Sequence, residues 1–457
     1  MPKLEYRELY APAHFSNSYE CVYPYEMKEI LREAKFWGFN AYSDWFDSAD
    51  LKHPDNNPRK EYHLSQAIWD RKQTAFKLAT DLGFQTGLLM TPNHVFLDQL
   101  RPDLLAETGG DFRFSGQVLC PSKPEGREII LNNYRGMFRD LRERGVHLDS
   151  ISGCPFDFGG CSCSSCAPYI ITFGKLMVDI HEIAKGYFPG IKARLTGWWW
   201  NKEDHKLFKE WADREQPGRF VSLSSYIPYQ AISPDPDTEL PNDCDLYAFV
   251  HIGYTDDQQN LSDRYGSWGP LIAPVRLAKT ILALEEMGST GFCAYSEGVH
   301  DDANKAILAG ISSGAFRDSR SVLKAYAERY FGVDSSASEA WAQWLHQWGD
   351  SFNVDLVKAR HDFDILSKSA VPGWRLDQWD AKLRIFEANA EVMRLERWNA
   401  DRNAAAERFF EEQDKCFRSV WKLTLLRHGI SPRFFRPVWY EEFDRDGAAR
   451  YAISESA

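Results

Sequence analysis

Residues 284–296 read Leu284-Glu-Glu-Met-Gly-Ser-Thr-Gly-Phe-Cys-Ala-Tyr-Ser296. An amphipathic helix ends there at Gly288, and a short apolar run follows that finishes in polar residues. Glycine is favoured just past a helix because it readily adopts the left-handed conformation that closes the last turn. A short, continuous apolar run is typical of a parallel strand that is covered on both faces. The stretch therefore predicts a helix followed by a buried parallel strand.

The same pattern recurs at residues 34–44, 79–90 and 141–151, with Gly38, Gly83 and Gly145 in the position of Gly288. Working outward from these anchors gives eight expected strands, near 9–15, 39–45, 85–91, 148–156, 192–199, 219–226, 245–252 and 290–296. The expected helices between them lie near 25–37, 67–82, 125–144, 169–187, 202–214 and 273–287. The connection over 227–243 is rich in Pro and Asp and is expected to be a loop.

Eight such units predict an α/β fold, a (β/α)8 TIM barrel over residues 1–318. A doubly wound open sheet is the competing architecture, but it would need a glycine-rich phosphate-binding turn after an early strand, and the sequence contains none. Residues 319–457 show helical periodicity only, in segments near 320–331, 337–365, 376–397 and 400–428. We expect a helical C-terminal domain that packs on the barrel or forms a homodimer.

Composition excludes several classes of partner. The net charge is −12 and no basic stripe occurs, which argues against a nucleic-acid partner. The N-terminus carries no apolar leader and no segment is apolar enough to span a membrane, so a cytoplasmic protein with reduced cysteines is expected. Aromatic residues make up 14% of the chain, with 16 tryptophans, and flat aromatic faces suit sugar rings.

Reactive residues of a barrel lie at the carboxyl ends of its strands. These ends supply carboxylates, imidazoles and aromatic rings, which together suit cleavage of a glycosidic bond. Glu297 follows the eighth strand and precedes Gly298, and Asp157 follows the fourth, so these two are the expected catalytic residues. The expected substrate-binding residues are His14, Asp44, Trp45, His94, Trp198, Trp200, Tyr226, His251 and Tyr254.

Four cysteines fall within thirteen residues: Cys154, Cys161, Cys163 and Cys166. Four thiols this close in a chain that is not secreted favour a tetrahedral zinc site, expected to be structural, over free or disulfide-linked thiols. The remaining cysteines, Cys120 among them, are isolated in sequence and are expected to be buried as small apolar residues. No organic cofactor is expected.

The segments Phe156-Asp-Phe-Gly-Gly-Cys-Ser-Cys-Ser-Ser-Cys-Ala-Pro168 and Tyr295-Ser-Glu-Gly-Val-His-Asp-Asp-Ala-Asn-Lys305 resemble those of poorly characterised barrel proteins related to glycoside hydrolases, distantly like hexosaminidases and α-glucuronidases. The resemblance implies a glycosidase-like activity with Asp157 and Glu297 in the site. Hexosaminidases that use the acetamido group of the substrate have two adjacent acids after strand four, whereas Phe158 follows Asp157 here. This departure argues against the substrate-assisted mechanism.

The sequence therefore predicts a glycosidase acting on a small oligosaccharide or glycoside. Strands four and eight lie opposite each other in such a barrel, which favours an inverting mechanism, although loops could bring the two carboxyl groups within the retaining distance of about 5 Å. Two alternatives remain open. One is a zinc-dependent barrel hydrolase or lyase that uses the cysteines, and the other is a barrel that binds carbohydrate without cleaving it.

Overall fold

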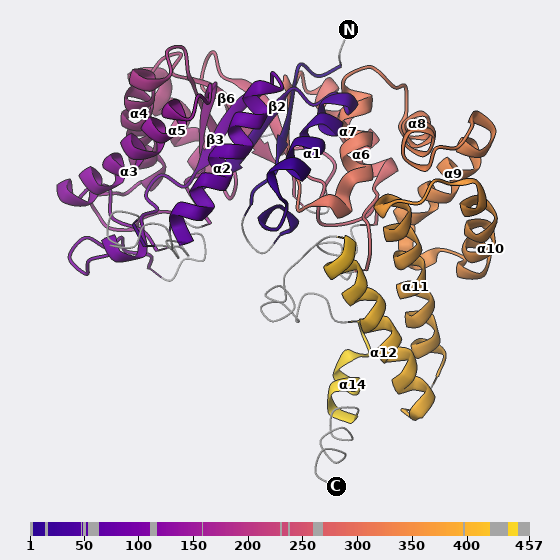
Figure 1. Cartoon of the computed structure of the whole chain (residues 1–457). Coiled ribbons are helices and arrows are strands. Elements are labelled where there is room, and N and C mark those ends of the chain that lie inside the picture. The colour runs from indigo at the N-terminus through magenta and orange to yellow at the C-terminus, as the bar shows by residue number, and fades with distance from the viewer. Residues whose placement is uncertain are drawn as a thin grey trace.

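The computed structural model of the chain describes residues 3–13, 17–46, 48, 52–53, 64–109, 117–157, 159–228, 231–235, 238–258, 268–395, 398–420 and 437–446. Eight parallel strands form a closed barrel in which each strand pairs with the next in sequence and β8 pairs with β1. A helical region follows the barrel (Figure 1). The predicted fold class is confirmed.

The strands are short, and most lie inside their predicted ranges. They are β1 Tyr6–Tyr10, β2 Ala41–Trp45, β3 Gln85–Met90, β4 Ser150–Gly153, β5 Lys192–Thr196, β6 Phe220–Tyr226, β7 Asp245–His251 and β8 Gly291–Tyr295. The prediction of 9–15 for the first strand was wrong. The register Tyr6↔Gly291 to Tyr10↔Tyr295 places β1 earlier, and Pro12, just beyond it, has no N–H to donate to a neighbouring strand.

The barrel helices are α1 Pro24–Trp37, α2 Leu64–Asp81, α3 Pro124–Glu143, α4 Tyr169–Tyr187, α5 Lys202–Glu215, α6 Pro274–Glu286 and α7 Asp302–Ser312. The glycines that ended the predicted helices have left-handed backbones, with φ of 115° at Gly38, 74° at Gly83, 76° at Gly145 and 67° at Gly288. Between β6 and β7, the described residues form no helix, as the composition of this connection predicts.

The barrel interior is polar at the amino ends of the strands and aromatic at their carboxyl ends. In the polar part, the Arg194 guanidinium lies 4.0 Å from the centre of the Tyr6 ring and donates a hydrogen bond of 2.9 Å to Ser222. Burial there raises the pKa of Glu8. The aromatic part is a cluster of its own, separate from the core between the strands and the helices. Its buried members are Tyr10, Trp45, Leu89, Tyr247, Phe249, Tyr254, Cys293 and Tyr295.

The C-terminal helices are α8 Ser319–Phe331, α9 Ser335–Gln347, α10 Leu356–Leu366, α11 Trp374–Arg394, α12 Ala400–Lys415 and α14 Tyr440–Asp446. The predicted helix over 337–365 is interrupted at Trp348–Asn353, where Asp350 has a non-helical backbone with φ of −124° and ψ of 67°. The predicted helix over 400–428 continues past α12 as a π-helical turn, Cys416–Val420, and its remainder lies outside the described residues.

The helical region packs beside α6 and α7, and the paired helices α11 and α12 extend past the barrel (Figure 1). The Arg375 guanidinium pairs with Asp302 of α7 at 2.6 Å, and Arg329 pairs with Glu33 of α1 at 2.7 Å. The loop after β7 also contacts this region, since the Trp268 ring lies 5.1 Å from Phe386 and 4.9 Å from Phe409. Within the described part of the chain, no helix is both long enough and apolar enough to cross a bilayer.

Candidate active site

The segment after β8 is held by a buried polar network. The Asp301 carboxylate accepts hydrogen bonds from Ser296 Oγ at 2.9 Å and from the Glu297 backbone N–H at 2.8 Å. Lys305 Nζ pairs with Asp301 at 2.7 Å and donates to the Gly298 carbonyl at 2.6 Å. These bonds fix the backbone on both sides of Glu297. Asp301 and Lys305, which follow the Tyr295-Ser-Glu-Gly segment, supply the side chains that make them.

Glu297 itself is buried, with 2% of its surface exposed. Gly253, in the loop after β7, allows this close packing, because a Cβ there would stand 2.7 Å from Glu297 Cβ. Gly298 has φ of 151°, and a Cβ there would overlap Ser18 Oγ at 1.6 Å. Only glycine fits at either position without displacing the segment that carries Glu297.

Asp157, after β4, has a left-handed backbone with φ of 76°. Burial raises its pKa to about 6, while a hydrogen bond from the Trp199 side chain acts in the opposite direction. Trp199 is itself left-handed, with φ of 61°. Two strained residues that are hydrogen-bonded to each other at strand ends are typical of a functional site, where the surrounding structure holds conformations that would otherwise be unfavourable.

The Tyr10 ring lies 5.3 Å from the Tyr295 ring, beside the end of β8. Burial raises the pKa of the Tyr10 hydroxyl, and the charges of Asp44, Cys293, Cys154 and Glu297 add to the effect. Burial also raises the pKa of Cys154, and the Asp157 carboxylate adds to it. Because β4 and β8 belong to one closed parallel barrel, Asp157 and Glu297 both lie at the rim formed by the carboxyl ends of the strands.

Aromatic residues also gather at this rim. The Trp198 ring lies 4.4 Å from the Tyr226 ring and 5.3 Å from the His251 ring. Tyr254 lies 4.9 Å from His251 and stacks on Tyr295 at 5.5 Å. On the other side, Trp45 lies 6.1 Å from the His94 ring. The structure thus brings Trp198, Tyr226, His251 and Tyr254 together, and pairs Trp45 with His94.

Two expected substrate-binding residues are placed elsewhere. Asp44 Oδ1 pairs with the buried Lys72 Nζ at 2.9 Å and accepts from the Trp45 backbone N–H at 2.7 Å. Since successive residues of a strand point to opposite faces, Asp44 faces α2 while Trp45 faces the interior. Trp200 packs against Phe208 at 5.1 Å and His205 at 5.0 Å, on the helical side of the strands. The structure therefore does not bring Asp44 and Trp200 together with the other expected substrate-binding residues, and His14 lies outside the described residues.

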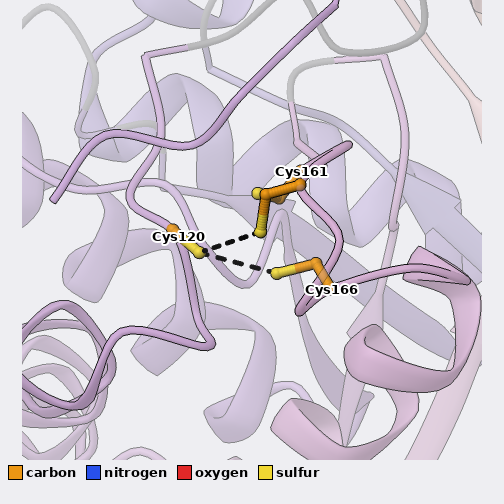
Figure 2. A group of neighbouring side chains, drawn as sticks. Cys120, Cys161 and Cys166 are labelled. Atoms are coloured by element: carbon orange, nitrogen blue, oxygen red, sulfur yellow. Dashed lines mark hydrogen bonds between the residues drawn. The ribbon is translucent and has the colours of Figure 1, made fainter.

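The cysteine cluster also differs from the expected set. Cys161, Cys163 and Cys166 come together with Cys120 of the loop after β3, and their sulfur atoms all lie within 4.8 Å of one another. Figure 2 shows Cys120, Cys161 and Cys166 pointing toward a common point. A hydrogen bond from the Cys166 thiol lowers the pKa of Cys161. Cys154 does not belong to this group: its thiol donates to the Phe156 carbonyl at 3.4 Å.

Sequence reasoning missed several residues of these sites. Tyr10 was missed because the first strand was predicted several residues too late. Trp199 was passed over between its two neighbours, although it is the indole that bonds to Asp157. Cys120 had a usable signal: loops that follow consecutive strands of a barrel are neighbours, so a cysteine after strand three is a candidate partner for cysteines after strand four.

The chain matches no family model and no curated protein sequence. It does resemble solved structures. CpGH89 from Clostridium perfringens, in complex with its substrate GlcNAc-alpha-1,4-galactose, aligns with a TM-score of 0.55 and 12% identity over 91% of this chain and 53% of that chain. A beta-N-acetylhexosaminidase aligns with a TM-score of 0.46 and 13% identity, covering 73% of this chain and 79% of that chain. CpGH84B aligns with a TM-score of 0.48 and 13% identity, covering 93% and 74%. At 12% identity, the likeness to CpGH89 shows a shared fold.

Proposed function

We propose that this protein is a glycoside hydrolase in which Asp157 and Glu297 are the catalytic carboxylates. One observation carries the proposal: the buried Glu297 and the half-buried Asp157 follow β8 and β4 of one closed barrel, and both lie at the rim where the aromatic residues gather. Glycosidic cleavage needs such a pair, one to protonate the leaving oxygen and one to stabilise the positive charge that develops on the sugar, to attack it or to activate water.

The surroundings favour a division of roles. Burial raises the pKa of Asp157 to about 6, so this carboxyl group holds a proton close to neutral pH and suits a general acid. Glu297 then acts as the second carboxylate, either as nucleophile or as the base that activates water. Its backbone N–H bonds to Asp301 and its carbonyl accepts from the Ser18 N–H, which fixes the backbone that carries the side chain.

The aromatic residues fit a sugar as substrate. Trp198, Trp199, Tyr226 and Tyr254 offer ring faces, and His94 and His251 offer ring nitrogens for hydroxyl groups. Among the described residues, nothing accepts a hydrogen bond from Trp198 Nε1, so a substrate hydroxyl could take that place. The proposed substrate is a small oligosaccharide or simple glycoside.

A panel of chromogenic aryl glycosides tests the proposal. Glu297→Gln should lower kcat about 100- to 10,000-fold, the usual contribution of a positioned acid, base or nucleophile. Asp157→Asn should lose more on glycosides with poor leaving groups than on nitrophenyl glycosides, because a good leaving group needs no proton. Glu286→Gln, at an exposed glutamate that ends α6, the helix before β8, is the matched control and should keep full activity.

Near-wild-type turnover by Glu297→Gln would contradict the assignment. Binding of sugars in calorimetry without release of product from any glycoside would instead indicate a barrel that binds carbohydrate. Following the anomer of the released sugar by NMR then decides between inversion and retention.

A further inference from the structure

We infer that Cys120, Cys161, Cys163 and Cys166 form a structural zinc site that joins the loops after β3 and β4. Cys120 Sγ lies 3.5 Å from Cys166 Sγ and 3.8 Å from Cys163 Sγ. Four sulfurs on a tetrahedron around zinc, each at about 2.3 Å, stand about 3.8 Å apart. The observed separations match this arrangement, and they are far longer than the bond of about 2.05 Å in a disulfide.

The four ligands come from two segments that other bonds hold in place. Asn93 Nδ2 donates to the Leu119 carbonyl at 3.0 Å and to the Gly160 carbonyl at 2.9 Å. Asn93 Oδ1 accepts from the Gly160 N–H at 3.2 Å. Leu119 and Gly160 immediately precede Cys120 and Cys161, so one fully buried amide fixes both segments. Asn93 therefore holds the two ligand-bearing segments side by side.

Further bonds shape the ligand positions themselves. The N–H of Cys166 donates to the Cys163 carbonyl at 2.9 Å, which closes the turn between these two cysteines. Backbone N–H groups also face the sulfurs: that of Cys163 bonds to Cys161, and that of Ser122 bonds to Cys120. Ser122 Oγ lies 3.0 Å from Cys166 Sγ. Donors around the sulfurs offset the negative charge of a tetrathiolate site.

The site is structural in its chemistry. Four thiolates fill all four tetrahedral positions of zinc, which leaves none for a water or a substrate, whereas catalytic zinc keeps one position open. Of the four cysteines, Cys120, Cys161 and Cys166 are fully buried. The ion would tie the segment that begins at Asp157 to the loop after β3, so it would support a candidate catalytic residue from a distance.

Metal analysis of the full-length protein, produced with zinc in the medium, tests the inference. We expect about one zinc per chain, a retained ion in Cys154→Ser, and loss of the ion in Cys120→Ser and Cys166→Ser. Cys154→Ser is the matched control, since it removes a buried cysteine from the same loop that lies outside the cluster. Loss of zinc in Cys154→Ser with retention in Cys120→Ser would overturn this ligand set.

A second measurement needs no variant and so does not depend on folding. Titration of the native protein with a mercurial reagent, in the presence of a zinc-sensitive dye, should release one zinc as four thiols react. Replacement by Co²⁺ should give thiolate-to-metal charge transfer and the visible bands of a tetrahedral site. Protein that contains no metal after purification with zinc, or in which these cysteines form disulfides, would refute the inference.

Discussion

Asp157 and Trp199 show how two residues can set the acidity of a site. Each has a left-handed backbone, which costs a residue other than glycine about 1–3 kcal/mol, and a hydrogen bond joins their side chains. Burial raises the pKa of Asp157 to about 6, and the indole N–H limits the rise because it stabilises the carboxylate. The acidity of Asp157 therefore depends on the position of Trp199.

A pH profile checks this dependence. If Asp157 is the acid, kcat/KM should fall as pH rises through the pKa of about 6, because the proton is lost. Trp199→Phe keeps an aromatic ring but removes the hydrogen bond to the carboxylate, so the pKa should rise and the alkaline limb should move to higher pH. Trp200→Phe, whose ring packs against Phe208, is the control and should leave the limb unchanged. A limb that stays fixed in Trp199→Phe would contradict the assigned hydrogen bond.

At this scale the sequence predicts some residues and misses others for physical reasons. Asp157 and Glu297 follow from counting strand ends, a rule that concerns only the order of elements. Asp44 also ends a strand, but its partner Lys72 comes from α2, and contacts between distant segments leave no local signal. The directions of the three consecutive indoles depend on the backbone angles of Trp199, which the pattern of apolar residues does not specify.

At the scale of elements, the segment from β8 into α7 is fixed by the buried ion pair of Lys305 and Asp301. Their side chains are 6% and 0% exposed, and Lys305 also holds the Gly298 carbonyl. Burial raises the pKa of Asp301, and the Lys305 charge acts against this rise. Removal of one partner from such a pair leaves a buried charge, which typically costs about 3–5 kcal/mol.

Lys305→Met should therefore lower the free energy of unfolding by roughly 3–5 kcal/mol at neutral pH, as measured by denaturant unfolding. The loss should shrink as pH falls. Without Lys305 the folded-state pKa of Asp301 rises further above its unfolded value, and a carboxyl group of raised pKa stabilises the fold in its protonated form. The double variant Lys305→Met/Asp301→Asn should recover part of the stability. A loss in the double variant equal to the sum of the losses in Lys305→Met and Asp301→Asn would show that the two charges do not interact.

Helix ends were predicted well where the periodicity is strong. Helix α4 matches its predicted range of 169–187 at both ends, and α1 ends at the predicted Trp37, just before Gly38. The break at Trp348–Asn353 was missed although Gly349, Asp350 and Ser351 are weak helix formers, because apolar residues on both sides continue the helical pattern. There the Ser351 N–H donates to Asp256 at 3.4 Å and the Gly349 carbonyl accepts from Asp257 at 3.0 Å, so contacts with the loop after β7 replace helical hydrogen bonds.

At the scale of the whole molecule, the barrel and the C-terminal helices share one core. Trp268 of the barrel and Trp341, Trp348 and Phe386 of the helical region belong to the same buried cluster. Arg375 and Tyr326 both bond to Asp302. Although burial raises the pKa of Asp302, the Arg375 charge holds it below its ordinary value. The boundary predicted between 318 and 319 falls where α8 begins, in the middle of this packing.

The full chain should therefore unfold in a single calorimetric transition. A chain that ends at residue 318 should be soluble only poorly and should melt at a lower temperature, because the surfaces of α6, α7 and Trp268 lose their cover. Arg375→Ala, which keeps all residues but removes the pairing with Asp302, serves as a milder comparison. Two separate transitions in the full chain, or a fragment 1–318 as stable as the full chain, would show that the two parts fold independently.

The pairing of β1 with β8 also has a consequence for synthesis. Tyr6 of β1 pairs with Gly291 of β8, where the barrel closes. The edge of β1 that faces β8 therefore stays unpaired while almost three hundred further residues are translated. Until then the growing chain exposes a strand edge that other chains can join, and the helices that cover α6 and α7 emerge later still. The growing chain is thus most prone to aggregate late in translation. Faster elongation over the last third of the message, or more chaperone, should raise the yield of folded protein.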